Sequence, residues 1–335
     1  MTAAQPPPSP RKSWWEWPNF LALDAVAVAL VWMPLMARSA GARLRDGEYV
    51  VLACGIWCVY MLDRMLDGLT RSGMHRRRHE FAARWWRPLA FCVAAAAGIA
   101  AWQAATAIPE IVMFAGLNFC IALAVYFGVT LASRSKWPGL IGAGTLSGLL
   151  AVALMQGAAL TPENSVLQIW RAIMSGFIIT LLYMCLRQTG TPAPWTLPRK
   201  MLGGWLFAVG TSLAPFVHKE MWRELLLGSP VVLFGCVCAF NSLAIRLWER
   251  SEPDFEERVL QRMLPWMLTT VAAGAFMECA GPDTWSRPVF IASGVAALLL
   301  LGLHTRGSRI PLAARRVLAD LAVLLPGAVM LTLPR

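Results

Sequence analysis

Charged residues are scarce in this chain of 335 amino acids, where they make up 15% of the residues against 57% that are hydrophobic. The mean hydropathy is +0.55. A soluble domain carries about as many apolar residues as its core can bury, and this chain carries more. The composition therefore excludes an ordinary soluble protein and predicts a single transmembrane helical domain over residues 19–335.

The loops lack a cysteine framework, because all eight cysteines lie in or at the ends of apolar runs. We expect these cysteines to pack as small apolar side chains rather than to form disulfides. Nor do we expect a cleaved signal peptide, since Pro and Trp residues separate the first basic residues from an apolar run that is already long enough to span. Residues 1–18 instead predict a disordered tail that ends in an aromatic belt at the membrane interface.

Eleven apolar runs are long enough to cross a membrane, which predicts an all-α polytopic bundle of about nine to eleven spans. The run at 201–217 is the shortest of them. The runs cover residues 19–38, 48–66, 88–106, 109–131, 138–159, 165–186, 201–217, 229–247, 264–281, 286–303 and 312–333.

The formal net charge of +11 would suit a nucleic-acid-binding protein, but the cations lie in short loops between apolar runs. The positive-inside rule accounts for such loops, so we expect no nucleic-acid partner. Alternate loops hold most of the cations, which predicts a multi-pass protein of the cell membrane, surrounded by lipid, with its N-terminus in the cytoplasm. These loop cations are Arg71, Arg76, Arg77, Arg78, Arg84, Arg87, Arg134, Lys136, Arg187, Arg199, Lys200, Arg250, Arg258, Arg262, Arg306 and Arg309.

The second apolar run ends in the sequence VYMLDRMLD, residues 59–67, where Asp63 and Asp67 lie one helical turn apart. Two carboxylates on one helix face repel each other unless a cation neutralises them. Oxygen-only ligands suit Mg²⁺, which proteins usually bind through one or two carboxylates and substrate phosphates. The alternative is a helix end with solvated acids, one of them paired with Arg64 or Arg71.

The eighth run ends in NSLAIRLWE, residues 241–249, and Asp254 follows in the next loop. Asn241, Ile245 and Glu249 share one helix face, and Asn241 lies about two turns inside the membrane. A polar group at that depth indicates either a functional site or an interhelical hydrogen bond. The two nine-residue segments share an arginine at the sixth position and an acid at the ninth, so they predict one site shared by two helix ends.

These segments resemble the two Asp-rich motifs of the UbiA superfamily of intramembrane prenyltransferases. The first family motif resembles N-D-x-x-D-x-x-x-D, and its last two acids correspond to Asp63 and Asp67, with Arg64 after the first of them. Val59 and Tyr60 replace its leading Asn and Asp, and Ile245 replaces the middle carboxylate of the second motif. Five runs lie between the two runs that carry the motifs, which exceeds the family's usual four helices.

The resemblance implies a bundle with a central cavity that opens to the cytoplasm, where Mg²⁺ bridges a prenyl diphosphate and the prenyl group passes to a lipid-soluble acceptor. A cyclase of the same architecture and a non-catalytic lipid-binding or transport protein are the alternatives. The Asn-x-x-x-Ile-x-x-x-Glu pattern also resembles the metal triad of class I terpene cyclases. The metal ligands and catalytic residues implied are Asp63, Asp67, Asn241 and Glu249, with Asp254 as a further metal ligand.

Arginines are expected to bind the diphosphate oxygens, because guanidinium groups pair with phosphate in a bidentate manner. The candidates are Arg64, Arg76, Arg77, Arg78 and Arg246. Aromatic and apolar side chains would line the cavity, although packing or interface anchoring would also explain each of them. Asp24, inside the first run, either pairs with a cation, becomes protonated or faces a polar cavity. The expected cavity residues are Asp24, Trp57, Tyr60, Ile245 and Trp248.

Overall fold

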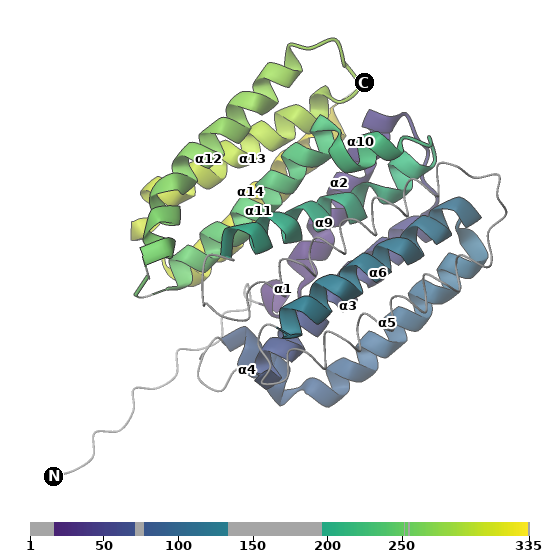
Figure 1. Ribbon diagram of the computed structural model, residues 1–335, viewed down its shortest axis with the longest axis horizontal. Coiled ribbons are helices and arrows are strands. Elements are labelled where there is room, and N and C mark those ends of the chain that lie inside the picture. Colours follow the sequence, from purple (N-terminus) through teal and green to yellow (C-terminus); the bar gives the residue numbers. More distant parts are fainter. Residues whose placement is uncertain (1–16, 71–76, 133–195, 251, 254, 334–335) are drawn as a thin grey trace.

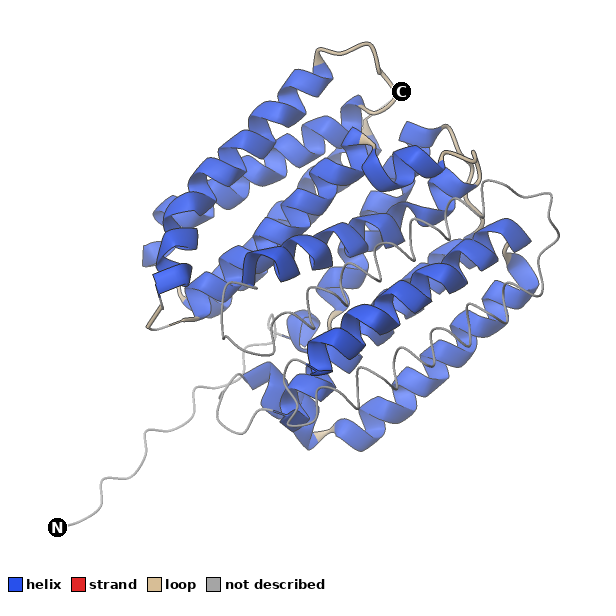
Figure 2. Cartoon of the chain, in the orientation of Figure 1, coloured by secondary structure: helices blue, strands red, loops and turns tan. Residues whose placement is uncertain are grey.

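The computed structural model of the protein describes residues 17–70, 77–132, 196–250, 252–253 and 255–333. Every regular element in these ranges is helical (Figure 2). The helices are α1 (Trp17–Phe20), α2 (Leu23–Ala40), α3 (Asp46–Thr70), α4 (Arg77–Arg84), α5 (Trp86–Ala107), α6 (Glu110–Ala132), α9 (Thr196–Val217), α10 (Trp222–Leu227), α11 (Ser229–Glu249), α12 (Phe255–Cys279), α13 (Arg287–Arg306), the short 3₁₀ turn η2 (Gly307–Arg309) and α14 (Leu312–Thr332).

Five helical segments are long and apolar enough to cross a membrane, so the chain is a multi-pass membrane protein. They are Leu23–Ala40, Trp86–Ala107, Lys200–Val217, Trp222–Glu249 and Arg287–Arg306. The helices α3, α12 and α14 are also long but carry more charged residues. They pack against the other helices of the bundle.

The helices pack side by side, and α2 lies inside the group (Figure 1). It contacts α3, α9 and α14, while α9 packs along α11 and α12 along α13. The centre of the apolar core is Trp32 of α2, which is fully buried and stacks on Phe234 of α11 with ring centroids 4.0 Å apart. Its indole nitrogen donates to the carbonyl oxygen of Val323 on α14 at 3.1 Å, so one side chain joins three helices.

Most helix boundaries match those predicted from the apolar runs, because a run of about twenty apolar residues is the length that a helix needs to span a bilayer. The run at 201–217 corresponds to the C-terminal part of α9. The runs at 138–159 and 165–186 lie outside the described residues, as does most of the N-terminal tail. Two boundaries were predicted incorrectly.

The first correction concerns the run at 19–38, which is not one continuous helix. The helix ends after α1 and a new helix, α2, begins at Leu23, because Ala22 adopts a left-handed backbone conformation with φ 56°. The second concerns the run at 264–281, where α12 already begins at Phe255. Its charged first turns were not part of the apolar run, and they extend the helix beyond it.

The bundle has two ends, and polar contacts between helix termini define each of them. At the first end the start of α2, the ends of α3 and α11 and the start of α14 meet; we call it the motif end, because both sequence motifs lie there. At the opposite end Arg38 of α2 donates to the carbonyl oxygens of Met330 and Leu331 on α14. The carboxylate of Glu48 on α3 also lies 2.5 Å from the ring of His218, just after α9.

Candidate functional site

Two side chains of α3 donate hydrogen bonds to backbone carbonyl groups at the interruption between α1 and α2. The Trp57 indole donates to the carbonyl oxygen of Leu21 at 2.8 Å. The guanidinium of Arg64 donates to the carbonyl oxygen of Asn19, which also accepts from the backbone nitrogen of Ala22. Helix breaks are tolerated where neighbouring groups satisfy the backbone, and they often border binding sites.

Five polar residues gather at this break; we call them the polar node. Asn19 donates through Nδ2 to Asp24 Oδ2 at 2.7 Å and lies 3.5 Å from Asp320 Oδ2. Asn241 Nδ2 donates to Asp320 Oδ1 at 3.1 Å. Arg64, 7% exposed, is close enough to interact electrostatically with Asp320. The node thus joins α1, α2, α3, α11 and α14 within an otherwise apolar bundle.

Tyr60 lies against the node from α3, near enough to interact electrostatically with Asp24, Asp320 and Arg64. Its ring meets Phe207 of α9 edge to face, with centroids 6.2 Å apart. Three of the residues predicted to line a cavity, Asp24, Trp57 and Tyr60, therefore surround this one place. For Asp24 the sequence left three environments open, and the structure gives it polar neighbours from α1 and α14.

The first motif lies on the last turns of α3. Asp63 is half-buried, and no hydrogen bond or ion pair joins it to another residue of the described ranges. Asp67 follows one turn later on the same helix, but its side chain lies outside what the structure describes, as do Arg76, the side chains of Arg77 and Arg78, and Asp254. Among the described residues there is no group of three or more His, Cys, Asp or Glu side chains that would hold a metal ion.

The polar side chains at both ends of the second motif contact α14. Asn241 donates to Asp320, and Glu249, with a side chain 1% exposed, forms an ion pair with Arg316 at 2.7 Å. Ile245, between them, packs against the apolar core. Through these contacts the second motif holds α11 to α14.

Trp248 faces the last turn of α13 rather than the polar node. Its indole donates to Nδ1 of His304 at 3.2 Å, and the guanidinium of Arg315 lies 5.2 Å from its ring centroid. A cation over an aromatic face is favourable by about 1 kcal/mol. The contacts of Trp248 are those of a residue that packs helix ends together.

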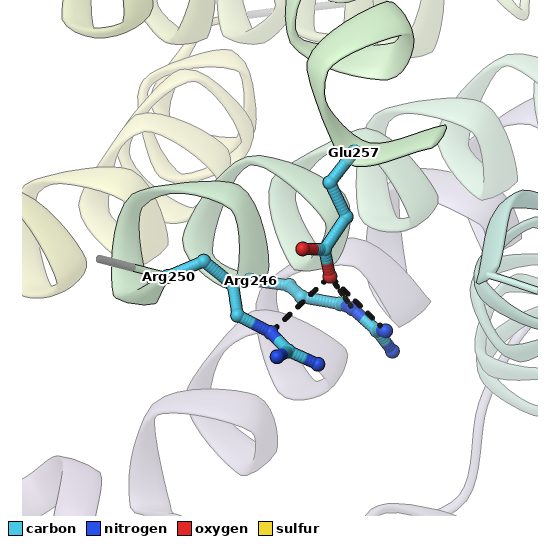
Figure 3. Close-up of polar contacts among 3 residues, drawn as sticks. All are labelled: Arg246, Arg250 and Glu257. Atoms are coloured by element: carbon cyan, nitrogen blue, oxygen red, sulfur yellow. Dashed lines mark hydrogen bonds and ion pairs between the residues drawn. The ribbon is translucent and has the colours of Figure 1, made fainter. Parts of the chain in front are cut away.

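Arg246 reaches the first turns of α12, where it meets a buried carboxylate (Figure 3). Glu257, 1% exposed, lies 3.3 Å from the guanidinium of Arg246 and 3.2 Å from Nε of Arg250. Arg246 of α11 and Arg250, the residue that follows this helix, thus converge on one acid at the start of α12. Arg246 and Arg64, both expected to bind diphosphate, each have a partner within the protein.

Sequence reasoning missed Asp320, which is the acid that connects the two motif helices. The signal was available, because Asp320 interrupts the apolar run 312–333 in the same way that Asp24 interrupts the first run. Asn19 and Arg316 gave no comparable signal, since both lie at the ends of apolar runs where polar residues are ordinary. Their importance comes from the broken helix and from the packing of α14 on α11.

Comparison of the chain with protein-family models, with curated protein sequences and with solved structures finds no match.

Proposed function

We propose that the protein is a membrane enzyme that ionises a prenyl diphosphate and transfers the prenyl group to a lipid-soluble acceptor. The observation that carries the proposal is the convergence of both motif helices on Asp320. Asn241 of α11 donates to this carboxylate, and Arg64 of α3 lies near it. Two similar segments that lie far apart in sequence thus border one polar site at one end of an apolar bundle.

In this proposal Asp63 and Asp67 hold Mg²⁺, with oxygens of the diphosphate completing the coordination. Asp63 fits this role because it is half-buried and has no protein partner in the described ranges. The bound ion neutralises charge on the diphosphate leaving group. The engaged amide of Asn241 and the ion-paired carboxylate of Glu249 instead position α11 against α14.

The basic segment that follows α3 in the sequence is proposed to supply the cations that this site needs. Arg64 and Arg246 have protein partners, so the diphosphate is proposed to meet Arg76, Arg77 and Arg78. The prenyl chain is proposed to lie in a cavity at the motif end, beside Tyr60 and Trp57. The excess of cations in the loops at this end supports its placement in the cytoplasm, and with it a cytoplasmic N-terminus.

The test is release of inorganic pyrophosphate from a panel of prenyl diphosphates by purified protein, with and without Mg²⁺. Mg²⁺-dependent release that requires an added acceptor supports the transferase. Release without an acceptor supports a cyclase of the same architecture. No release from any prenyl diphosphate would reject both enzymatic readings in favour of a non-catalytic membrane protein.

A further inference from the structure

One acceptor of the polar node, the amide oxygen of Asn241, is buried and has no hydrogen-bond partner among the described residues. The amide nitrogens of Asn19 and Asn241 donate to Asp24 and Asp320, and the guanidinium of Arg64 donates to a backbone carbonyl. A buried acceptor without a donor costs about 1–3 kcal/mol, so the surroundings of Asn241 favour one additional donor.

The charges of the node are unbalanced in the same direction. Asp24 and Asp320 contribute two negative charges when both are ionised, and Arg64 contributes one positive charge. The other groups that face the pair are neutral: Asn19 from α1, Tyr60 from α3, and Asn241 and Cys238 from α11. One additional positive charge would make the node neutral, which matters because a net charge inside a bundle is costly.

The geometry favours a proton over a metal ion as that charge. The amide nitrogen of Asn19 lies 2.7 Å from Asp24 Oδ2 and 3.5 Å from Asp320 Oδ2, so the two carboxyl groups lie side by side around one nitrogen. Two carboxyl groups form a hydrogen bond only if one of them carries a proton, because an ionised carboxylate is an acceptor alone. The amide nitrogens of Asn19 and Asn241 also point at the carboxylate oxygens. A metal ion at those oxygens would therefore face N–H hydrogens instead of amide oxygens.

We propose that Asp24 and Asp320 bind one exchangeable proton at neutral pH, shared between their carboxyl groups, and that this proton joins α2 to α14. The proton comes from water and replaces the direct repulsion of two carboxylates by a hydrogen bond. The buried oxygen of Asn241, beside Asp320, is an additional acceptor for it. The proposal does not depend on the enzymatic reaction, and it assigns a proton-binding role to two residues that lie on different helices.

Infrared spectroscopy of the purified protein tests this directly, because a protonated carboxyl group has a carbonyl stretch that an ionised carboxylate lacks. We expect the wild type at neutral pH to show this band and to shift it on transfer from H₂O to D₂O. Asp24→Asn and Asp320→Asn should each abolish it, since the remaining carboxylate would be ionised beside Arg64. Asp46→Asn, at an exposed acid in the first turn of α3 at the opposite end of the bundle, should leave the band unchanged.

Either single amide substitution removes the repulsion and keeps the shape of the side chain, so the variants are expected to fold. Thermal unfolding at neutral pH checks this before the spectra are compared. Absence of the band from the wild type would overturn the proposal, as would its persistence in both variants. Loss of the wild-type band on addition of Na⁺ or K⁺ would also overturn it, in favour of a site for a monovalent cation.

Discussion

Arg316 of α14 lies 2.7 Å from the carboxylate of Glu249 on α11, whose side chain is 1% exposed. Four residues further along α14, Asp320 accepts a hydrogen bond from Asn241. Both polar ends of the second motif are therefore bound by one neighbouring helix. This arrangement explains how the motif can be important for the fold even where it does not itself hold a metal ion.

Arg316→Met should destabilise the protein more than Glu249→Gln. Removing Arg316 deprives a buried carboxylate of its ion-pair partner, at a cost of about 2 kcal/mol once the partial exposure of the arginine is considered. The amide of Gln, in contrast, carries no charge that needs compensation. Thermal unfolding in detergent measures both variants, with Arg309→Met at an exposed position as the control. Equal stability of Arg316→Met and wild type would show that the pair contributes nothing.

Asp63→Asn and Asp67→Asn should each abolish Mg²⁺-dependent pyrophosphate release while the bundle stays folded. An amide lacks the charge that holds Mg²⁺, and like charges on one helix face contribute nothing favourable to folding without metal. Asp254→Asn should reduce release less, because this residue lies beyond the second motif in the sequence. The variants are compared at matched expression in lipid, with Asp46→Asn as the control. Full activity of both motif variants would contradict the proposed metal site and favour a non-catalytic protein.

Gly204→Ala should destabilise the contact between α9 and α11. A Cβ atom at Gly204 would lie 2.4 Å from the backbone nitrogen of Ala239 and 2.5 Å from the carbonyl oxygen of Gly235. Neither atom belongs to a flexible side chain, so the helices must separate, at a cost of about 1–3 kcal/mol. Gly98→Ala on α5 is the matched control, since its Cβ would meet no atom within 4 Å. A lower melting temperature is expected for Gly204→Ala alone.

Glu257→Gln should weaken the attachment of the first turns of α12 to the end of α11. The buried carboxylate accepts contacts from Arg246 and Arg250 (Figure 3), and a hydrogen bond to a charged group contributes about 1.5–3 kcal/mol. Limited proteolysis between α11 and α12 is expected to become faster. Glu252→Gln, at an exposed acid in the same connection, provides the comparison. Unchanged cleavage of Glu257→Gln would contradict a role for this acid in fixing the connection.

Two reporter cysteines should reveal the orientation in the membrane. Glu252→Cys lies between α11 and α12 at the motif end, and Asp283→Cys lies between α12 and α13 at the other end. A cytoplasmic motif end predicts that a membrane-impermeant thiol reagent labels the cysteine at 283 in intact cells and the one at 252 only after lysis. The opposite pattern would reverse the proposed topology.

The helix ranges could be predicted because spanning length and apolar composition are properties of the sequence alone. The break at Ala22 could not, because alanine favours helix, and the carbonyl groups beside it accept hydrogen bonds from Trp57 and Arg64 of another helix, which the local sequence does not reveal. The partners of Asn241 were equally inaccessible, since a polar residue inside a span signals that a partner exists without identifying it. Asp320 is different. Its position inside an apolar run indicates a buried polar role, but nothing in the sequence places it beside Asp24.

The close approach of α9 and α11 restricts how the molecule can move. Backbone meets backbone around Gly204 and Gly235, so at this contact no flexible side chain can absorb sliding or rotation of the two helices. We therefore expect α9 and α11 to move together and to carry Asn241 with them. A motion that admits a molecule to the motif end would then displace α2, α3 or α14 relative to this pair, and displacement of α14 would break the contact of Asp320 with Asn241.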